Sequence, residues 1–425
     1  MHPAKHDGCM EEHRSQLRPK YSRDVSLWLL MFIGFVPWIG DSASRLYVQL
    51  YLRDIGSSSV TIGLSTSLIF LGLLLGSAAW GWLADRQNVR GLIFSIFLGT
   101  SLVVGLCAFL PTSGWMLFLV FVRAAIIAGL GPIIMALVSR RTDSTNRGRK
   151  LSYVSSARGL GNFTGSILAG FALVGLGYRG SFLLAALIPL PLLLFAIKLL
   201  KTTQRRDDSR RPSNRALRHT GLAGLYLGIV FRQMGNSGAV SLVFVYMAAL
   251  AIPTQTMGIL NALNPAMQIV AMLIFGRVAD LVGRKRVFLS GFLLSAIALI
   301  LFALSRSVLI IGTAFTLIGV AYPALFIGST AYIGDVTPKG SHGIMLGLFE
   351  SSRGLGGVAG PVLAGFLVQH VSYQSMFFCM GGLAALGYLC VAYTTSSMLR
   401  PKRYQYRVHM QNEQETRAQE EETIG

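Results

Sequence analysis

The sequence has few charged residues, and the acidic ones are the scarcest. Of its 425 residues, 13% are charged and 52% are hydrophobic, whereas soluble domains carry roughly 25% charged residues. Asp and Glu together number 18 against 38 Lys and Arg, which gives a formal net charge of +20. The shortage of charge excludes an ordinary soluble domain and indicates a chain that is largely embedded in a membrane.

Cysteine and histidine are also scarce. The four cysteines (Cys9, Cys107, Cys379 and Cys390) show neither paired nor metal-type spacing, and the histidines lie outside the long apolar runs or at their edges. The sequence therefore predicts no disulfide framework and no metal site. It also lacks the Walker spacing of a nucleotide-binding loop, which argues against an ATP-driven pump. We expect no cofactor and, since no catalytic constellation is present, no enzymatic activity.

Long apolar runs are what the chain has instead. A membrane-spanning helix needs roughly 20 apolar residues. Twelve such runs cover residues 25–52, 60–83, 91–110, 115–138, 151–176, 181–200, 220–247, 255–276, 286–305, 308–332, 343–369 and 374–398. The sequence thus predicts an all-α membrane protein. We divide it into an N-terminal tail (1–24), a six-helix bundle (25–200), a polar linker (201–219), a second six-helix bundle (220–398) and a C-terminal tail (399–425).

The basic residues are unevenly distributed between the two alternating sets of loops. Three arginines (Arg53, Arg179 and Arg306) lie in one set of loops, and nearly all the other basic residues outside the apolar runs lie in the opposite set or in the two termini. This asymmetry is the positive-inside rule, so we expect both termini to be cytoplasmic in a multi-pass protein of the cell membrane. The net charge is then explained by topology and by contact with anionic lipid, and we expect no nucleic-acid partner.

The two halves repeat each other at an offset of 195 residues. Residues 156–171 read SARGLGNFTGSILAGF and residues 351–366 read SSRGLGGVAGPVLAGF, with ten of sixteen positions identical. Secondary transporters are often built from such duplicated halves, with a central site where the repeats meet.

The loops after the second and eighth runs carry a further repeated pattern. They read GWLADRQNVR (Gly81–Arg90) and GRVADLVGRK (Gly276–Lys285). Both resemble the loop signature G-x-L-A-D-R-x-G-R-K of the major facilitator superfamily, from which they depart at Asn88, Val89 and Leu281. The resemblance implies twelve helices in two pseudo-symmetric bundles. It also implies that Asp85 reaches the start of the eleventh span and holds the outward-open state. The predicted latch residues are Gly81, Asp85, Arg86, Arg90, Gly276, Asp280, Arg284 and Lys285.

The fifth run resembles a second pattern of this family, G-x-x-x-G-P-x-x-G-G, which is found in its proton-coupled exporters. Here the sequence is GNFTGSILAG (Gly161–Gly170), with Ser166 in place of the proline and Ala169 in place of a glycine. The resemblance implies export rather than import.

Ionisable residues inside the apolar runs are the remaining signal. A charge at the centre of a membrane helix costs at least about 2.5–3.5 kcal/mol, so each should face a partner or a wet cavity. Asp41 and Arg45 lie four residues apart on one helix face, Arg232 lies near the middle of the seventh run, and Asn236 occupies the repeat position of Asp41. The predicted proton-coupling and cavity residues are Asp41, Arg45, Arg123, Arg158, Arg232, Asn236, Glu350 and Arg353. Pairing of Glu350 with Arg353 and of Arg232 with Asp41 is expected, the latter in competition with a role of Arg232 in substrate binding.

The sequence therefore predicts a proton-coupled secondary transporter. It would work by alternating access, driven by the proton gradient, and export small molecules such as drugs or metabolites. The alternative is a symporter that takes up an organic anion, which would be attracted by Arg45, Arg123 and Arg232. A membrane sensor without transport is disfavoured because the polar tails are short. We expect the partners to be a small-molecule substrate, protons and membrane lipid, and the protein to be a monomer.

Overall fold

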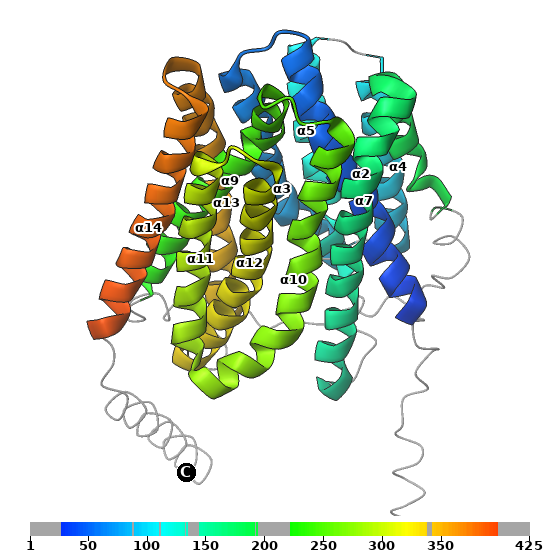
Figure 1. Ribbon diagram of the computed structural model, residues 1–425. Coiled ribbons are helices and arrows are strands. Elements are labelled where there is room, and N and C mark those ends of the chain that lie inside the picture. Colours follow the sequence, from blue (N-terminus) through cyan, green and yellow to red (C-terminus); the bar gives the residue numbers. More distant parts are fainter. Residues whose placement is uncertain are drawn as a thin grey trace, which may run out of the picture.

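The computed structural model describes residues 27–86, 89–109, 112–131, 133–134, 144–191, 193, 222–337 and 342–397. Over these residues the chain is helical and contains no strand, as the sequence predicts (Figure 1). The helices are α2 (Leu27–Asp54), α3 (Ser59–Arg86), α4 (Val89–Cys107), α5 (Ser113–Ile127), α7 (Ser144–Leu187), α9 (Ala223–Ala249), α10 (Thr254–Val282), α11 (Arg284–Leu304), α12 (Val308–Val336), α13 (His342–His370) and α14 (Tyr373–Ser397). The two predicted tails and the predicted linker lie outside the described residues.

The long helix α7 contains two of the predicted spans. Its backbone turns at Gly177, where φ is +64° and ψ is −176°. A positive φ of this kind strains any residue that has a Cβ, so glycine is required at the turn. The described helices include residues of all twelve predicted spans, although the fourth and sixth spans extend beyond the described residues.

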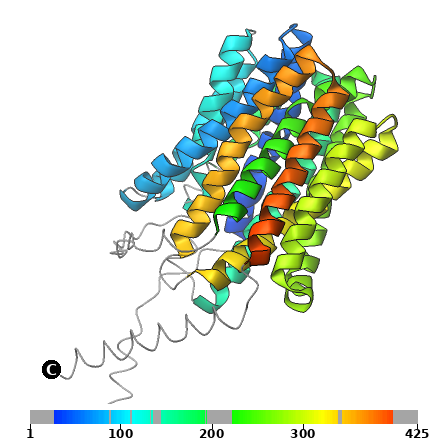
Figure 2. The ribbon, with the colours of Figure 1, turned by 90° about the vertical axis from the view of Figure 1, so that its left-hand side faces the viewer.

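The helices run roughly side by side, and their connections gather at two ends (Figures 1 and 2). We call the end formed by residues 54–59, 177, 250–253, 305–307 and 371–372 the upper side, as it is drawn in Figure 1. The opposite end, where α2 begins and α14 ends, is the lower side. Both described ends of the chain therefore lie on the same side of the molecule.

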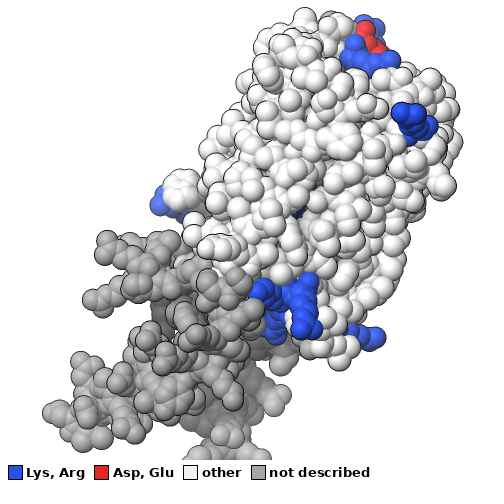
Figure 3. Space-filling model, turned by 60° about the vertical axis from the view of Figure 1, so that its left-hand side comes forward, with Lys and Arg blue, Asp and Glu red and all other residues white. Residues whose placement is uncertain are grey.

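Six of the described helices are long and apolar enough to cross a membrane, and α4 and α5 are shorter apolar helices. The long helices α2, α9 and α13 are not among the six, and they are the ones that carry Asp41, Arg232 and Glu350. The surface in Figure 3 shows a broad uncharged belt between charged side chains at the two ends. This is the distribution expected of a protein whose middle lies in lipid.

The packing divides the helices into two groups that follow the sequence repeat. In the first half α2 packs on α7 and α3 on α5, while in the second half α9 packs on α13 and α14, and α11 on α12 and α14. Between the halves, the main contacts are α7 with α10 and α3 with α13. The offset of 195 residues relates α3 to α10 and α7 to α13. Each of the two contacts is therefore the repeat copy of the other, and the halves meet in a pseudo-symmetric way.

Glycines make the contact between the halves close, and they do so in repeat pairs. A Cβ placed on Gly258 would lie 2.6 Å from the carbonyl oxygen of Ser166, and one placed on Gly63 would collide with the carbonyl oxygen of Pro361. Gly258 and Ser166 are the repeat positions of Gly63 and Pro361. Small residues of this kind let membrane helices approach each other closely. All four positions lie in the upper half of their helices, so the halves are closed together there.

Hydrogen bonds between the halves support the same closure. The side chain of Gln49 on α2 donates to the Val240 carbonyl on α9 (3.1 Å) and accepts from the Phe244 amide (3.4 Å). Ser67 Oγ on α3 donates to the Val358 carbonyl on α13 (2.6 Å). Gln49 is thus a two-point link between the two innermost helices.

We expect Gly258→Val to open the upper side. The branched side chain cannot fit against Ser166, so the upper halves of α7 and α10 must separate. The measurement is labelling of a Leu50→Cys reporter by a membrane-impermeant maleimide added from the upper side, in a background without native cysteines, and labelling should rise several-fold. Gly382→Val is the matched control, because a Cβ there meets no atom within 4 Å. Equal labelling in the two variants would contradict the assignment of this contact to upper-side closure.

Candidate functional site

A buried charge triad lies in the middle of the first half. Asp41 on α2 is 5% exposed, and both of its carboxylate oxygens are occupied. Oδ2 accepts from Arg45 Nη2 at 2.5 Å, and Oδ1 accepts from Arg123 Nη1 on α5 at 2.6 Å. The side chain of Arg123 is 4% exposed, whereas that of Arg45 is 44% exposed. The triad carries a net charge of +1, and Arg45 is the member that reaches open space.

The helix geometry explains why these three residues meet. Asp41 and Arg45 are four residues apart and so share one face of α2. Asp41 is 13 residues from the upper end of α2, or about 20 Å at 1.5 Å per residue. In a hydrocarbon core about 30 Å thick this places the triad well inside the membrane. The sequence predicts the Asp41–Arg45 pair, but the arrival of Arg123 from α5 depends on tertiary packing.

A chain of small polar groups runs beside the triad and joins the two halves. Ser42 Oγ and Ser166 Oγ are 2.8 Å apart, and Asn261 Nδ2 on α10 donates to Ser166 Oγ at 2.8 Å. Ser166 also donates to the carbonyl of Asn162 on its own helix. The position where the exporter pattern has proline is thus used here for a hydrogen bond that links α2, α7 and α10. None of these partners was predicted from the sequence.

Arg232 on α9 is the most deeply buried cation of the second half. It is 2% exposed, and its Nε donates to Ser295 Oγ on α11 at 3.0 Å. The expected pairing of Arg232 with Asp41 is wrong for this conformation: Arg232 is bonded to Ser295, and Asp41 forms its ion pairs with Arg45 and Arg123. Asn236, one turn further on, has a buried Oδ1 that finds no partner among the described residues. The second half thus has asparagine at the position where the first half has the carboxylate of Asp41.

The repeated arginines each lie over an aromatic ring. The guanidinium carbon of Arg158 is 4.4 Å from the centroid of the Trp38 ring, and that of Arg353 is 5.4 Å from the Tyr322 ring. Arg353 Nη1 also donates to both oxygens of Glu350, at 3.0 and 2.9 Å, which confirms the expected pair. The rings were not predicted, although Trp38 is three residues before Asp41 and so lies on the same face of α2.

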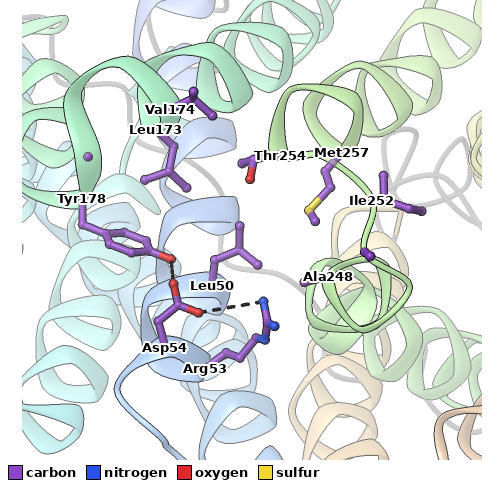
Figure 4. Close-up of a pocket in the computed structure, with 12 residues that line it drawn as sticks. Leu50, Arg53, Asp54, Leu173, Val174, Tyr178, Ala248, Ile252, Thr254 and Met257 are labelled. Atoms are coloured by element: carbon purple, nitrogen blue, oxygen red, sulfur yellow. Dashed lines mark hydrogen bonds and ion pairs between the residues drawn. The ribbon is translucent and has the colours of Figure 1, made fainter.

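A pocket of about 320 Å³ opens at the upper side between the halves (Figure 4). Its polar wall is made by α2 and α7, where Tyr178 donates to Asp54 Oδ2 at 2.5 Å and Arg53 lies 3.8 Å from the same carboxylate. Partial burial and the neighbouring carboxylate raise the pKa of the Tyr178 hydroxyl well above its usual range. Apolar side chains from both halves, such as Leu50 and Met257, complete the lining.

The predicted latch is described only in part. Gly81 and Gly276 have open space around the position of a Cβ, and the Arg86 guanidinium lies 4.0 Å from the centroid of the Trp82 ring. Gly283 turns the chain between α10 and α11 with a φ of +99°. The side chains of Asp85, Arg90 and Asp280 lie outside the described residues, so the latch stays a prediction. Within the described part of the chain no cluster of metal-ligating side chains occurs.

The triad generates a stability prediction. Asp41→Asn leaves the buried Arg123 without a counter-charge, and breaking a buried pair in this way costs about 3–5 kcal/mol. Arg123→Gln leaves Asp41 paired with Arg45 and should cost less. The double variant Asp41→Asn/Arg123→Gln should be more stable than Asp41→Asn alone by at least about 1 kcal/mol, as expected for directly coupled residues. Thermal unfolding in detergent gives the ranking, and a double variant that melts below both single variants would contradict it.

Comparison with known proteins agrees with this architecture. The sequence profile of the Major Facilitator Superfamily matches residues 30–246 and 225–416. The multi-drug resistance efflux pump PmrA of Streptococcus pneumoniae serotype 4 is 23% identical over 387 residues, which cover 87% of this chain and 94% of that protein. The multidrug resistance protein MdtG of a Rahnella species is 24% identical over 367 residues, covering 81% and 89%.

A solved structure shows the same fold at much lower identity. The crystal structure of the nucleoside transporter NupG matches with a TM-score of 0.73 and 13% identity, over 87% of this chain and 98% of that one. The profile covers nearly all of the described helices, from α2 to α14. The pseudo-symmetric halves, the membrane helices and the profile match together show that the chain is a member of the major facilitator superfamily of transporters.

Proposed function

We propose that the protein is a proton-coupled exporter of small molecules that works by alternating access, with its lower side in the cytoplasm. The observation that carries the proposal is the triad, in which a single deep carboxylate is held by two arginines of different helices. Intramembrane ionisable residues are costly and usually functional. The similarity to proteins named as multidrug efflux pumps supports export.

The triad supports a simple coupling scheme. An ionised Asp41 binds Arg45 and Arg123 and holds α2 against α5. A protonated Asp41 loses the charge that both arginines need, so the triad loosens and Arg45 becomes free to move. A proton and the closed triad are thus mutually exclusive, and this exclusion couples proton movement to the positions of α2 and α5.

Alternating access requires two closures that exclude each other. The upper closure in this structure consists of the paired glycine contacts and the links made by Gln49 and Ser67. The lower closure in this proposal is the latch at Asp85 and its repeat copy at Asp280. A substrate entering from the lower side would meet the exposed Arg45 and leave when the upper closure opens.

Uptake of an organic anion is the second candidate. Apart from Lys198 and Arg286 at span ends, the predicted spans contain five arginines (Arg45, Arg123, Arg158, Arg232 and Arg353) and two carboxylates (Asp41 and Glu350). An excess of positive charge in a low-dielectric cavity attracts negative substrates. The direction of transport, rather than the coupling, separates this candidate from the first.

We expect Asp41→Asn to abolish transport that is driven by a pH gradient. Asparagine cannot release a proton, so a gradient can no longer do work through the triad. The measurement is uphill transport of a panel of cationic and anionic dyes by purified protein in sealed vesicles. Asp54→Asn is the matched control, because it removes the other acidic residue of α2 at the upper, half-exposed end. Uphill transport at the wild-type rate by the Asp41 variant would exclude this proton site.

We expect Asp85→Asn to move the population away from the state that is open on the upper side. Loss of the latch charge leaves the lower side without its closure. A Ser155→Cys reporter should label faster from the lower side, and a Leu50→Cys reporter should label more slowly from the upper side. Asp280→Asn should have a smaller effect, since Leu281 replaces the arginine of the signature. Unchanged labelling in Asp85→Asn would rule out the latch.

A further inference from the structure

Arg158 is a cation without a counter-charge in the described structure. Its guanidinium lies over Trp38, and no described carboxylate is within ion-pair distance of it. The side chain is exposed, although α7 is a membrane helix. It lies 19 residues below the turn at Gly177, or about 28 Å, which is close to the lower boundary of a core about 30 Å thick.

The exposed side of Arg158 faces the interior of the protein rather than lipid. Leu160 and Phe171 are exposed on α7, and they lie about 200–220° around the helix from Arg158 at 100° per residue. Gly159, the next residue, packs on Ile269 of α10, and Gly161 packs on Phe35 and Trp38 of α2. Arg158 therefore lies between the face that contacts α2 and the face that contacts the other half. The exposed side of Arg158 is thus turned toward the inner side of the lower end, and we call the surface formed there by Arg158 and Trp38 the vestibule.

The vestibule and the charge triad share one face of α2. Trp38, Asp41 and Arg45 follow one another on one face of α2, at steps of about one turn. The rise is about 4.5 Å from Trp38 to Asp41 and about 10.5 Å from Trp38 to Arg45. Arg45 is 44% exposed. Two exposed guanidinium groups, Arg158 near the lower boundary and Arg45 near the midplane, thus lie about two turns of α2 apart on the inner side of the first half.

The repeat provides an internal comparison. Arg353 is the repeat copy of Arg158, but it is neutralised by Glu350, which is 56% exposed. Ser155 occupies the position in the first half that Glu350 occupies in the second. The first half has thus kept the stacked arginine and has a serine where its carboxylate would stand. Among the described residues, Arg158 is therefore available to bind an anion, whereas its repeat copy Arg353 is already paired with Glu350.

We propose that the vestibule at Arg158 and Trp38 is the entry site for an organic anion, with a carboxylate or sulfonate bound by the Arg158 guanidinium. Arginine binds such planar anions through two parallel N–H donors. The stacking on Trp38 holds the guanidinium in place, which lowers the entropy lost on binding. The inference rests on the proposed transport function and assigns its substrate class, whichever direction transport takes.

The test is direct binding, without a proton gradient. Purified full-length protein in phosphatidylcholine nanodiscs is titrated against fluorescein, an anionic probe, and ethidium, a cationic one, with fluorescence anisotropy as the readout. Arg158→Gln should weaken fluorescein binding about tenfold, the equivalent of about 1.4 kcal/mol. Arg158→Lys keeps the charge but loses the paired donors and the stacking on Trp38, so its affinity should lie between those of the wild type and Arg158→Gln. Arg179→Gln, an exposed arginine on the second part of α7, is the matched control and should leave binding unchanged.

Two carboxylate variants make the test independent of folding. Ser155→Glu gives the first half the carboxylate of the second and should weaken fluorescein binding. Glu350→Gln releases Arg353 and should strengthen it. Effects in opposite directions cannot come from a general loss of structure. Weak binding of fluorescein by the wild type, or equal affinities in Arg158→Gln and Arg179→Gln, would overturn the proposal.

A lipid headgroup is the other source of the same chemistry. If phosphatidylglycerol added to the nanodiscs abolishes fluorescein binding to the wild type, the site takes lipid phosphate and the substrate assignment fails. If binding is unaffected by phosphatidylglycerol, the soluble anion is the ligand. Because no step depends on protons, a failure here leaves the Asp41 coupling scheme standing, and loss of gradient-driven transport in Asp41→Asn can be scored separately.

Discussion

A carboxylate buried inside a membrane helix must be neutralised, and the arrangement of the first half follows from this need. Asp41 is 5% exposed and binds Arg45 of its own turn and Arg123 of α5. The low dielectric that makes an isolated charge so costly also makes the paired charges hold strongly. The ion pair with Arg123 links α2 to α5, which otherwise packs mainly on α3 and α4.

The two halves of the protein share the arrangement of their helices but differ in the positions of their buried charges. Glycine contacts such as Gly63 with Pro361 and Gly258 with Ser166 repeat at the offset of 195 residues and give the pseudo-symmetric interface. The charges break the symmetry, because Asn236 replaces the carboxylate of Asp41 and Arg232 is bonded to Ser295 instead. In the proposed mechanism, the symmetric packing would let the halves exchange one closure for another. The asymmetric charges would couple that exchange to a proton.

The same asymmetry recurs at the lower side. Arg158 and Arg353 are repeat copies, and each lies over an aromatic ring. Glu350 neutralises only the second of them. Over the predicted spans the positive charge exceeds the negative, and Arg158 contributes to this excess near the lower boundary. In our proposals, the charges select the substrate, and the glycine contacts form the closure that opens during transport.

The helices, the repeat and the family signature can all be recognised in the amino-acid sequence. Twenty apolar residues can only cross a membrane as a helix, so the spans could be located from composition alone. The spacing of Asp41 and Arg45, and of Glu350 and Arg353, fixed two ion pairs because residues three or four apart share a helix face. Only the tertiary structure decided which helices meet. The contacts of Asp41 with Arg123, of Arg232 with Ser295 and of Arg158 with Trp38 depend on the rotation of each helix about its axis. That rotation is set by packing against several neighbours at once, which no local pattern of residues encodes.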